Sequence, residues 1–93
     1  MDGTTDIEIR RRKARFRAQR RGFREVDMIF IAYADAHLEK LTEDELTAFE
    51  ALLNVPDWHI YGWFMGHDPV PPEFDTPVFA QLCAYRENLG AKA

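Results

Sequence analysis

The sequence predicts an all-α protein, a small single-domain bundle of about five helices. Apolar side chains recur at spacings of three and four residues along most of the chain, which is the period of one helix face. No segment alternates polar and apolar side chains as a half-buried strand would. A capping box at residues 42–45 marks one helix start.

The 93 residues suffice for one modest core and leave little room for a deep substrate pocket. We therefore expect residues 1–93 to form one helical domain, with residues 1–5 and 90–93 frayed at its ends. Aromatic residues, 13% of the chain, should supply much of the core because each ring can bury a large area.

The first two expected helices meet at a glycine. Residues 6–20 form the first, and Ile9 and Phe16 share one face of it. Its many arginines repel one another, so this helix needs docking through Phe16 to persist. Gly22 interrupts, and residues 23–40 form the second helix. The apolar face of this second helix comprises Phe23, Val26, Phe30, Tyr33, Ala34, His37 and Leu41.

The capping box starts the third helix, which ends near Asn54. Thr42 can accept a hydrogen bond from the amide of Glu45, whose carboxylate can reach back to the amide of Thr42. Acidic residues in this first turn also suit the helix dipole.

Asp57 is a plausible N-cap for a short fourth helix over residues 58–65. This segment is apolar on nearly every side, so it is stable only when packed. Gly66 closes it, and the proline-rich residues 67–72 form an extended connection.

The last expected helix runs over residues 73–88. Pro77 is tolerated only in a first turn, so the regular part starts at Asp75 or Thr76. Gly90 acts as its C-terminal stop.

Charge is distributed unevenly along the chain, although the net charge is only −4. No acidic residue interrupts residues 10–24, whereas acids dominate from Glu25 onward. Such a separation creates a dipole that affects encounter rates and partner choice more than the fold. Nine of the twelve basic residues lie in residues 10–24: Arg10, Arg11, Arg12, Lys13, Arg15, Arg17, Arg20, Arg21 and Arg24.

Several classes of protein are disfavoured. Cys83 is the only cysteine, so the chain forms no internal disulfide and no thiolate metal cluster. No apolar run is long enough to span a membrane, and no apolar stretch resembling a secretory signal follows Met1. We expect a cytoplasmic bacterial protein without a membrane partner.

Catalysis and metal binding also lack support. His37, His59, His67 and Asp68 match no ligand spacing of a known metal site. Cys83 has no evident histidine partner, and packing in the core explains it better. The sequence contains neither a glycine-rich phosphate loop nor a serine elbow. We expect no enzyme activity.

The change from basic to acidic sequence falls at Arg21-Gly22-x-x-Glu25, and two interpretations stay open. In the structural one, Gly22 is the N-cap of the second helix and Glu25 completes half a capping box. In the functional one, Gly22 leaves a spot free of side chain where a partner's backbone comes close, while Arg21 and Glu25 supply directional hydrogen bonds.

Three blocks of sequence resemble one known family, over about residues 10–89. Residues 20–27 resemble the Arg-Gly-x-x-Glu signature of the SdhE family, the flavinylation or assembly factors of succinate dehydrogenase, called succinate dehydrogenase assembly factor 2 in mitochondria. Residues 41–53 are similar to the family's third helix, and residues 57–63 to its motif that runs from an aspartate to a tryptophan. His59 stands where the family usually has an acid.

The resemblance implies a small helical bundle that helps FAD become attached covalently to the flavoprotein subunit of succinate dehydrogenase. It implies fumarate reductase's flavoprotein as a second client. It also implies a chain that binds no cofactor stably, acts on FAD held by its partner and has no catalytic residue. The partner-binding residues that it implies are Arg21, Gly22, Arg24, Glu25, Asp27, Asp57 and Trp63.

A second class of function uses the same arginines. A nucleic-acid-binding or antitoxin-like regulator would bind phosphate through the basic first helix. The chain lacks a zinc finger, a recognition helix and an aromatic platform, and its pI of about 5.3 opposes this interpretation.

Overall fold

A computed structural model of the protein describes residues 6–19 and 22–86. Five α-helices and two short 3₁₀ helices occur in this part of the chain, without a strand. The α-helices are α1 (Asp6–Ala18), α2 (Arg24–His37), α3 (Glu43–Leu53), α4 (Asp57–Phe64) and α5 (Pro77–Ala84). The 3₁₀ helices are η1 (Leu38–Lys40) and η2 (Pro72–Phe74). The expected all-α bundle is confirmed. The expected fraying at 1–5 and 90–93 lies outside the described residues, as does the expected stop at Gly90.

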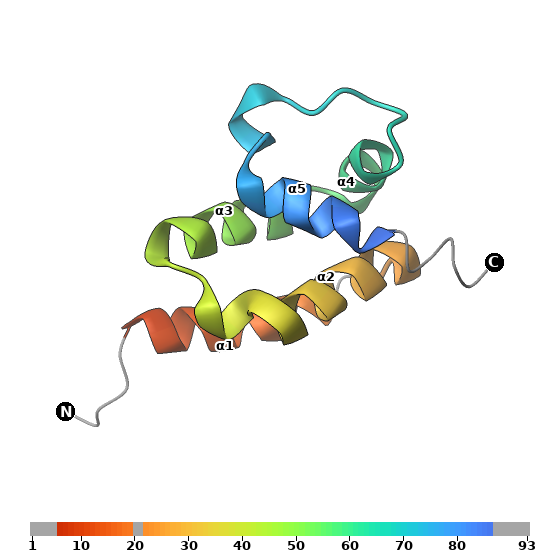
Figure 1. Cartoon of the computed structure of the whole chain (residues 1–93). Coiled ribbons are helices and arrows are strands. Elements are labelled where there is room, and N and C mark those ends of the chain that lie inside the picture. The colour runs from red at the N-terminus through yellow and green to blue at the C-terminus, as the bar shows by residue number, and fades with distance from the viewer. Residues whose placement is uncertain (1–5, 20–21, 87–93) are drawn as a thin grey trace.

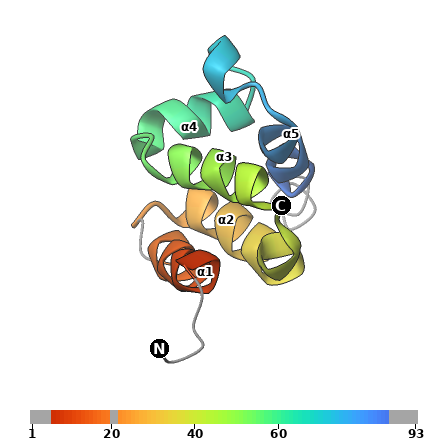
Figure 2. The same ribbon diagram turned by 90° about the vertical axis from the view of Figure 1, so that its left-hand side faces the viewer.

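Helix α2 is the element around which the others pack. Helices α1, α3, α4 and α5 surround it, as the two views in Figures 1 and 2 show. Its Phe30 lies against Phe49 of α3 and Phe64 of α4, with ring centroids 5.6 and 6.0 Å apart. Tyr33 is buried, and its hydroxyl donates a hydrogen bond to Gln81 Oε1 of α5 at 2.7 Å. Burial raises the pKa of Tyr33 to about 12. The predicted apolar face of this helix therefore forms the core.

Helix α3 begins as its sequence predicts. The amide of Thr42 donates to Glu45 Oε1 at 2.9 Å, and the amide of Glu45 donates to Thr42 Oγ1 at 3.2 Å. These two hydrogen bonds satisfy amides that the first helical turn leaves without a backbone partner. The capping box is confirmed.

Helix α1 docks through small side chains, not through the aromatic one that the sequence analysis proposed. Ala14 and Ala18 are buried, whereas Phe16 is 56% exposed. An alanine lets two helix backbones come close, and the large ring on the opposite side of α1 then projects away from the body. The prediction that Phe16 anchors this helix was wrong.

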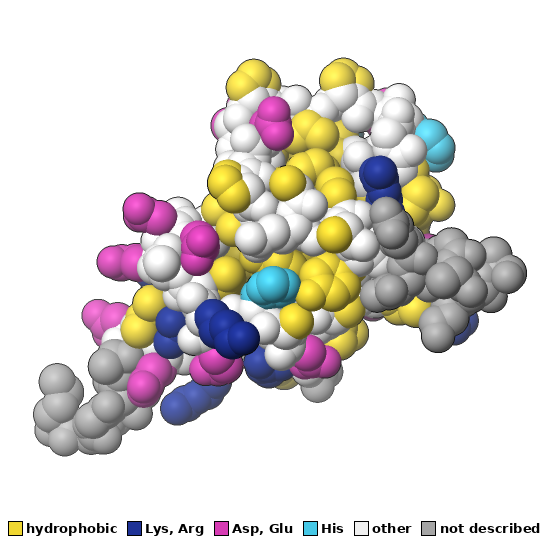
Figure 3. Space-filling model, in the orientation of Figure 1, with side chains coloured by type: hydrophobic (Ala, Val, Ile, Leu, Met, Phe, Trp, Pro, Cys, Tyr) yellow, Lys and Arg dark blue, Asp and Glu magenta, His cyan; other side chains and the backbone are white. Residues whose placement is uncertain are grey.

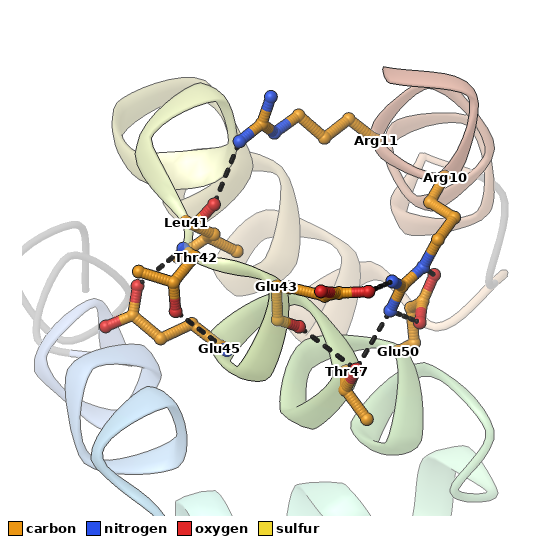
Figure 4. A network of polar contacts seen from close by, with 8 residues as sticks. All are labelled: Arg10, Arg11, Leu41, Thr42, Glu43, Glu45, Thr47 and Glu50. Carbon is orange, nitrogen blue, oxygen red and sulfur yellow. Dashed lines mark hydrogen bonds and ion pairs between the residues drawn. The ribbon is translucent and has the colours of Figure 1, made fainter. Parts of the chain in front are cut away.

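Arginines add polar contacts that attach α1 to its neighbours (Figure 4). Arg10 donates two hydrogen bonds to the carboxylate of Glu50, at 2.7 and 3.1 Å, and a third to Thr47 Oγ1 at 2.9 Å. Arg11 donates to the carbonyl oxygen of Leu41 at 2.9 Å. Charge-assisted and bidentate contacts of this kind fix the orientation of the two helices. The repulsion expected within α1 is thus offset by acceptors on its neighbours.

Further along α1, Arg15 makes a similar contact. Its Nη1 lies 2.8 Å from Asp35 Oδ1 of α2. Arg10, Arg11 and Arg15 therefore hold the helix in place, and they are only partly available to an outside partner.

Helix α4 starts one residue earlier than predicted. Pro56, not Asp57, is its N-cap, because the Pro56 carbonyl accepts hydrogen bonds from the amides of His59 and Ile60 at 3.1 and 3.2 Å. Asp57 is instead the first helical residue, where a carboxylate suits the helix dipole. Gly66 follows the helix with φ +77, a left-handed conformation that ends it as expected.

Helix α5 is shorter than the predicted segment over residues 73–88. Thr76 caps it by accepting a hydrogen bond from the amide of Phe79 at 3.2 Å, and Pro77 occupies its first position. Proline has no amide hydrogen to leave unsatisfied there. Glu73 belongs to the separate 3₁₀ turn η2, and Asn88 lies outside the described residues.

Replacing Ala18 by leucine tests how α1 docks. The added methylenes have no space, so unfolding free energy should fall by about 1–3 kcal/mol. Replacing the exposed Phe16 by alanine should cost less than Ala18→Leu. Urea denaturation followed by circular dichroism measures both. If Phe16→Ala lowered the unfolding free energy more than Ala18→Leu, Phe16 would be the residue that docks α1 after all.

Removing the cap of α3 gives a second test. Thr42→Ala should lower the unfolding free energy by about 1 kcal/mol, since the amide of Glu45 loses its acceptor. Thr42→Ser keeps the hydroxyl and should stay near the wild-type value in the same urea titration. Equal stability of all three proteins would show that the capping box contributes nothing.

Candidate functional site: the corner between α1 and α2

Four of the predicted partner-binding residues lie at the start of α2: Gly22, Arg24, Glu25 and Asp27. We call residues 17–19 at the end of α1, residues 22–23 and the first turn of α2 the α1–α2 corner. Arg21, one of the predicted contacts, lies outside the described residues, as does Arg20.

Gly22 gives the corner its backbone conformation. Its φ is +90, a left-handed region that a residue with a side chain adopts only at a cost of roughly 1–2 kcal/mol. A Cβ built at Gly22 would meet no other atom within 4 Å, so the position opens to solvent. Glycine is therefore needed for the turn and not for internal packing. The same opening lets a partner's backbone approach closely.

Asp27 fixes this turn from one helical turn further along. Its Oδ2 accepts a hydrogen bond from the amide of Gly22 at 3.3 Å. Its own amide donates to the carbonyl of Phe23 at 2.8 Å. Asp27 Oδ1 is buried and has no hydrogen-bond partner within the described part of the chain. Asp27 thus holds the backbone of the corner.

The capping interpretation of Gly22 and Glu25 was wrong. Phe23 is the N-cap of α2, so Glu25 is the second residue of the helix and not the third. Phe23 offers no side-chain oxygen, and Asp27 takes over the amide that a capping box would satisfy. Glu25 is left exposed, as is Arg24 beside it. Both can therefore reach a partner, with Glu25 favoured by the positive end of the helix dipole.

Helix α4 lies against this corner, and two contacts bracket its first turn. On one side, Phe23 packs on Tyr61 with ring centroids 5.0 Å apart. On the other, Arg17 near the end of α1 donates a hydrogen bond to Asn54, just before α4. Asp57, a predicted contact, is half-buried in this first turn.

Trp63 does not share this location. Its ring packs on Phe74 and Phe79, with centroids 5.2 and 6.3 Å away. It also forms one wall of an apolar groove of about 370 Å³, on a side of α4 different from Tyr61. The predicted site residues therefore divide into the corner and this groove. The groove is lined by Ala51, Asn54, Val55, Pro56, His59, Trp63 and Phe74.

Trp58 is the surface feature that the sequence did not reveal. Its place in a segment that is apolar on nearly every side suggested packing in the core. The structure leaves its side chain 74% exposed. The helical period of residues 57–64, with Ile60 and Phe64 on the buried side, was the available signal.

Charge is segregated in space as well as in sequence. Acidic side chains gather at the end of the molecule where α1 and α3 begin (Figure 3). The α1–α2 corner lies toward the other end (Figure 1) and carries exposed Arg17 and Arg24. An acidic partner surface would be attracted to the corner.

The described residues contain no candidate metal centre, and their one cysteine is not activated. No group of three or more His, Cys, Asp or Glu is placed to hold a metal ion in residues 6–19 and 22–86. Burial raises the pKa of the Cys83 thiol, with Arg86 acting in the opposite direction, so the thiolate is disfavoured. No described helix is both long and apolar enough to cross a membrane.

Comparison with known proteins identifies relatives along most of the chain. A protein named FAD assembly factor SdhE, from Acetobacter pasteurianus, is 34% identical over 77 residues, which cover 83% of this chain and 71% of that protein. A mitochondrial succinate dehydrogenase assembly factor 2 from Dictyostelium discoideum is 35% identical over 84 residues, covering 90% of this chain and 60% of its own. The counterpart from Yarrowia lipolytica is 31% identical over 87 residues, which cover 89% of this chain and 60% of that protein. The chain thus spans about three fifths of these mitochondrial relatives.

A family model described as "Flavinator of succinate dehydrogenase" matches residues 12–86. The match includes the end of α1, the α1–α2 corner and every later helix. The chain therefore belongs to the family of flavinators of succinate dehydrogenase.

Proposed function

We propose that this protein promotes covalent attachment of FAD to the flavoprotein subunit of succinate dehydrogenase. The family assignment and the names of its relatives support this function. The structural observation that carries it is the corner at Gly22, which is open to solvent and held by Asp27. A protein of this kind acts by binding its client, not by catalysing the reaction itself.

The chemistry belongs to the flavoprotein and its FAD. Covalent attachment requires a histidine of the flavoprotein to lie against the flavin in a reactive orientation. Orientation alone can lower a barrier by several kcal/mol. A helper that binds the reactive conformer more tightly raises its population in proportion to that difference in affinity. It needs no bound cofactor of its own and acts on FAD that its partner holds.

Each corner residue has a part in this binding. Gly22 lets the client's backbone come close, because nothing occupies the position of a side chain. Arg24 and Glu25 are exposed beside it and can form charge-assisted hydrogen bonds. Arg21 is placed next to Gly22 by sequence alone. Asp27 holds the turn in the conformation that the client meets.

The nucleic-acid alternative gains no support from the geometry. Arg10, Arg11 and Arg15 use their guanidinium groups to attach α1 to the body. Arg12 and Lys13 are exposed, which suits electrostatic steering of the client.

We further propose that fumarate reductase's flavoprotein is a second client. We also propose that the protein works in the bacterial cytoplasm, as its likeness to the Acetobacter protein suggests.

The decisive variant is Gly22→Arg, for which the chain offers a matched control. Gly66 also has positive φ, at +77, and also has open space where a Cβ would stand. Gly66→Arg should therefore cause similar backbone strain, but it follows α4 and lies away from the corner. We expect Gly22→Arg to abolish flavinylation and Gly66→Arg to retain most of it.

The measurement is in-gel flavin fluorescence of the denatured flavoprotein subunit after incubation with FAD and a dicarboxylate. Fluorescence that survives denaturation reports the covalent bond. Equal labelling without the protein, or with Gly22→Arg, would contradict the proposed function. If the protein alone modified FAD or a histidine peptide, the helper mechanism would have to be abandoned in favour of an enzyme.

Steering by α1 can be tested separately. Reversing the charges of Arg12 and Lys13 to glutamate should slow association with the flavoprotein subunit, by roughly tenfold at low salt. The dissociation rate should change little, because these residues lie outside the corner. Stopped-flow association rates should converge with wild type above about 0.5 M salt, where screening removes the effect. An unchanged rate at low salt would exclude steering by this helix.

A further inference from the structure

Trp58 is the most exposed large apolar side chain of the described residues, at 74%. Its helix is nevertheless firmly anchored, since Ile60 and Phe64 are completely buried. The indole therefore projects from a rigid support and is not a side chain on a loose loop. A rigid aromatic side chain loses little conformational freedom when it is buried by a partner.

The position of Trp58 ties it to the α1–α2 corner. Residues three apart lie on neighbouring parts of a helix surface, so Trp58 adjoins Tyr61. Tyr61 packs on Phe23 of the corner, 5.0 Å between ring centroids. The Arg17–Asn54 hydrogen bond joins the end of α1 to the residue that caps α3, just before α4. Trp58 is thus linked to the surface around Gly22 through Tyr61 and Phe23, and it does not line the groove formed by Trp63.

We propose that Trp58 is the apolar anchor of the interface formed by the Gly22 corner, and that it inserts into an apolar recess of the client flavoprotein subunit. This inference rests on the proposed function. Exposed Arg17 and Arg24 lie in this region beside exposed Glu25, so the recess should carry carboxylates on its rim to pair with the two arginines and a donor to pair with Glu25. Tryptophan is among the residues that most often dominate the energy of an interface.

A second copy of this chain is a poorer occupant of the same surface. In a two-fold symmetric dimer the same patch faces itself. Such a dimer would cover the α1–α2 corner beside Trp58 and would block the client's access to Gly22.

Fluorine NMR of the protein labelled with 5-fluorotryptophan tests the proposal directly. The chain has two tryptophans, so two resonances are expected, and Trp58→Phe assigns them. Titration with unlabelled flavoprotein subunit loaded with FAD should shift or broaden the Trp58 resonance far more than that of Trp63. In parallel, Trp58→Ala should raise the Kd at least roughly tenfold. His59→Ala, an exposed neighbour on another side of α4, is the matched control and should bind nearly as wild type.

Three other results would overturn the inference, and each would show a different reason for its failure. If Trp58→Ala binds as tightly as wild type while Gly22→Arg does not bind, the proposed function stands and the anchor is refuted. If the wild-type protein fails to bind the subunit, the proposed function fails and the inference fails with it. If sedimentation shows a dimer that Trp58→Ala dissociates, the surface belongs to a second copy. Because Trp58 is exposed, Trp58→Ala should keep the wild-type circular dichroism spectrum and unfolding midpoint.

Discussion

The left-handed turn at Gly22 is the constraint on which the arrangement depends. It lets the chain reverse after α1, so that Ala14 and Ala18 come close to the body and Arg10 meets Glu50. Asp27 holds the turn through the Gly22 amide. The same conformation leaves an opening without a side chain at the surface. One residue therefore serves both the folding of α1 and the proposed contact with a client.

Sequence patterns with a local physical cause predicted most of the fold. The capping box of Thr42 and Glu45 and the apolar face of α2 needed only spacing and side-chain chemistry, and both are confirmed. The predicted ends of helices near prolines were less accurate. Helix α4 begins at Asp57, one residue before the predicted start, because the carbonyl of Pro56 accepts its first hydrogen bonds. Rules based on side chains do not detect this feature.

Features that depend on tertiary packing could not be predicted. Phe16 was expected to dock α1, yet alanines do so, because close approach of helix backbones depends on the neighbour's shape. The binding roles of the proposed site residues stay a prediction. In position, the Gly22 amide and Asp27 meet, whereas Trp63 lies at a groove, and the sequence analysis overlooked Trp58. Which aromatic side of α4 faces solvent depends on how α2 and α5 cover it.

The central claim is that the protein favours one conformer of its client, and relative affinities test it most directly. Isothermal titration should compare the flavoprotein subunit without FAD, with noncovalent FAD and with FAD already attached. The account predicts the tightest binding to the subunit that holds noncovalent FAD poised for attachment, and weaker binding once the bond has formed. Equal affinity for all three forms would contradict it, since a ligand that binds every state equally shifts no population.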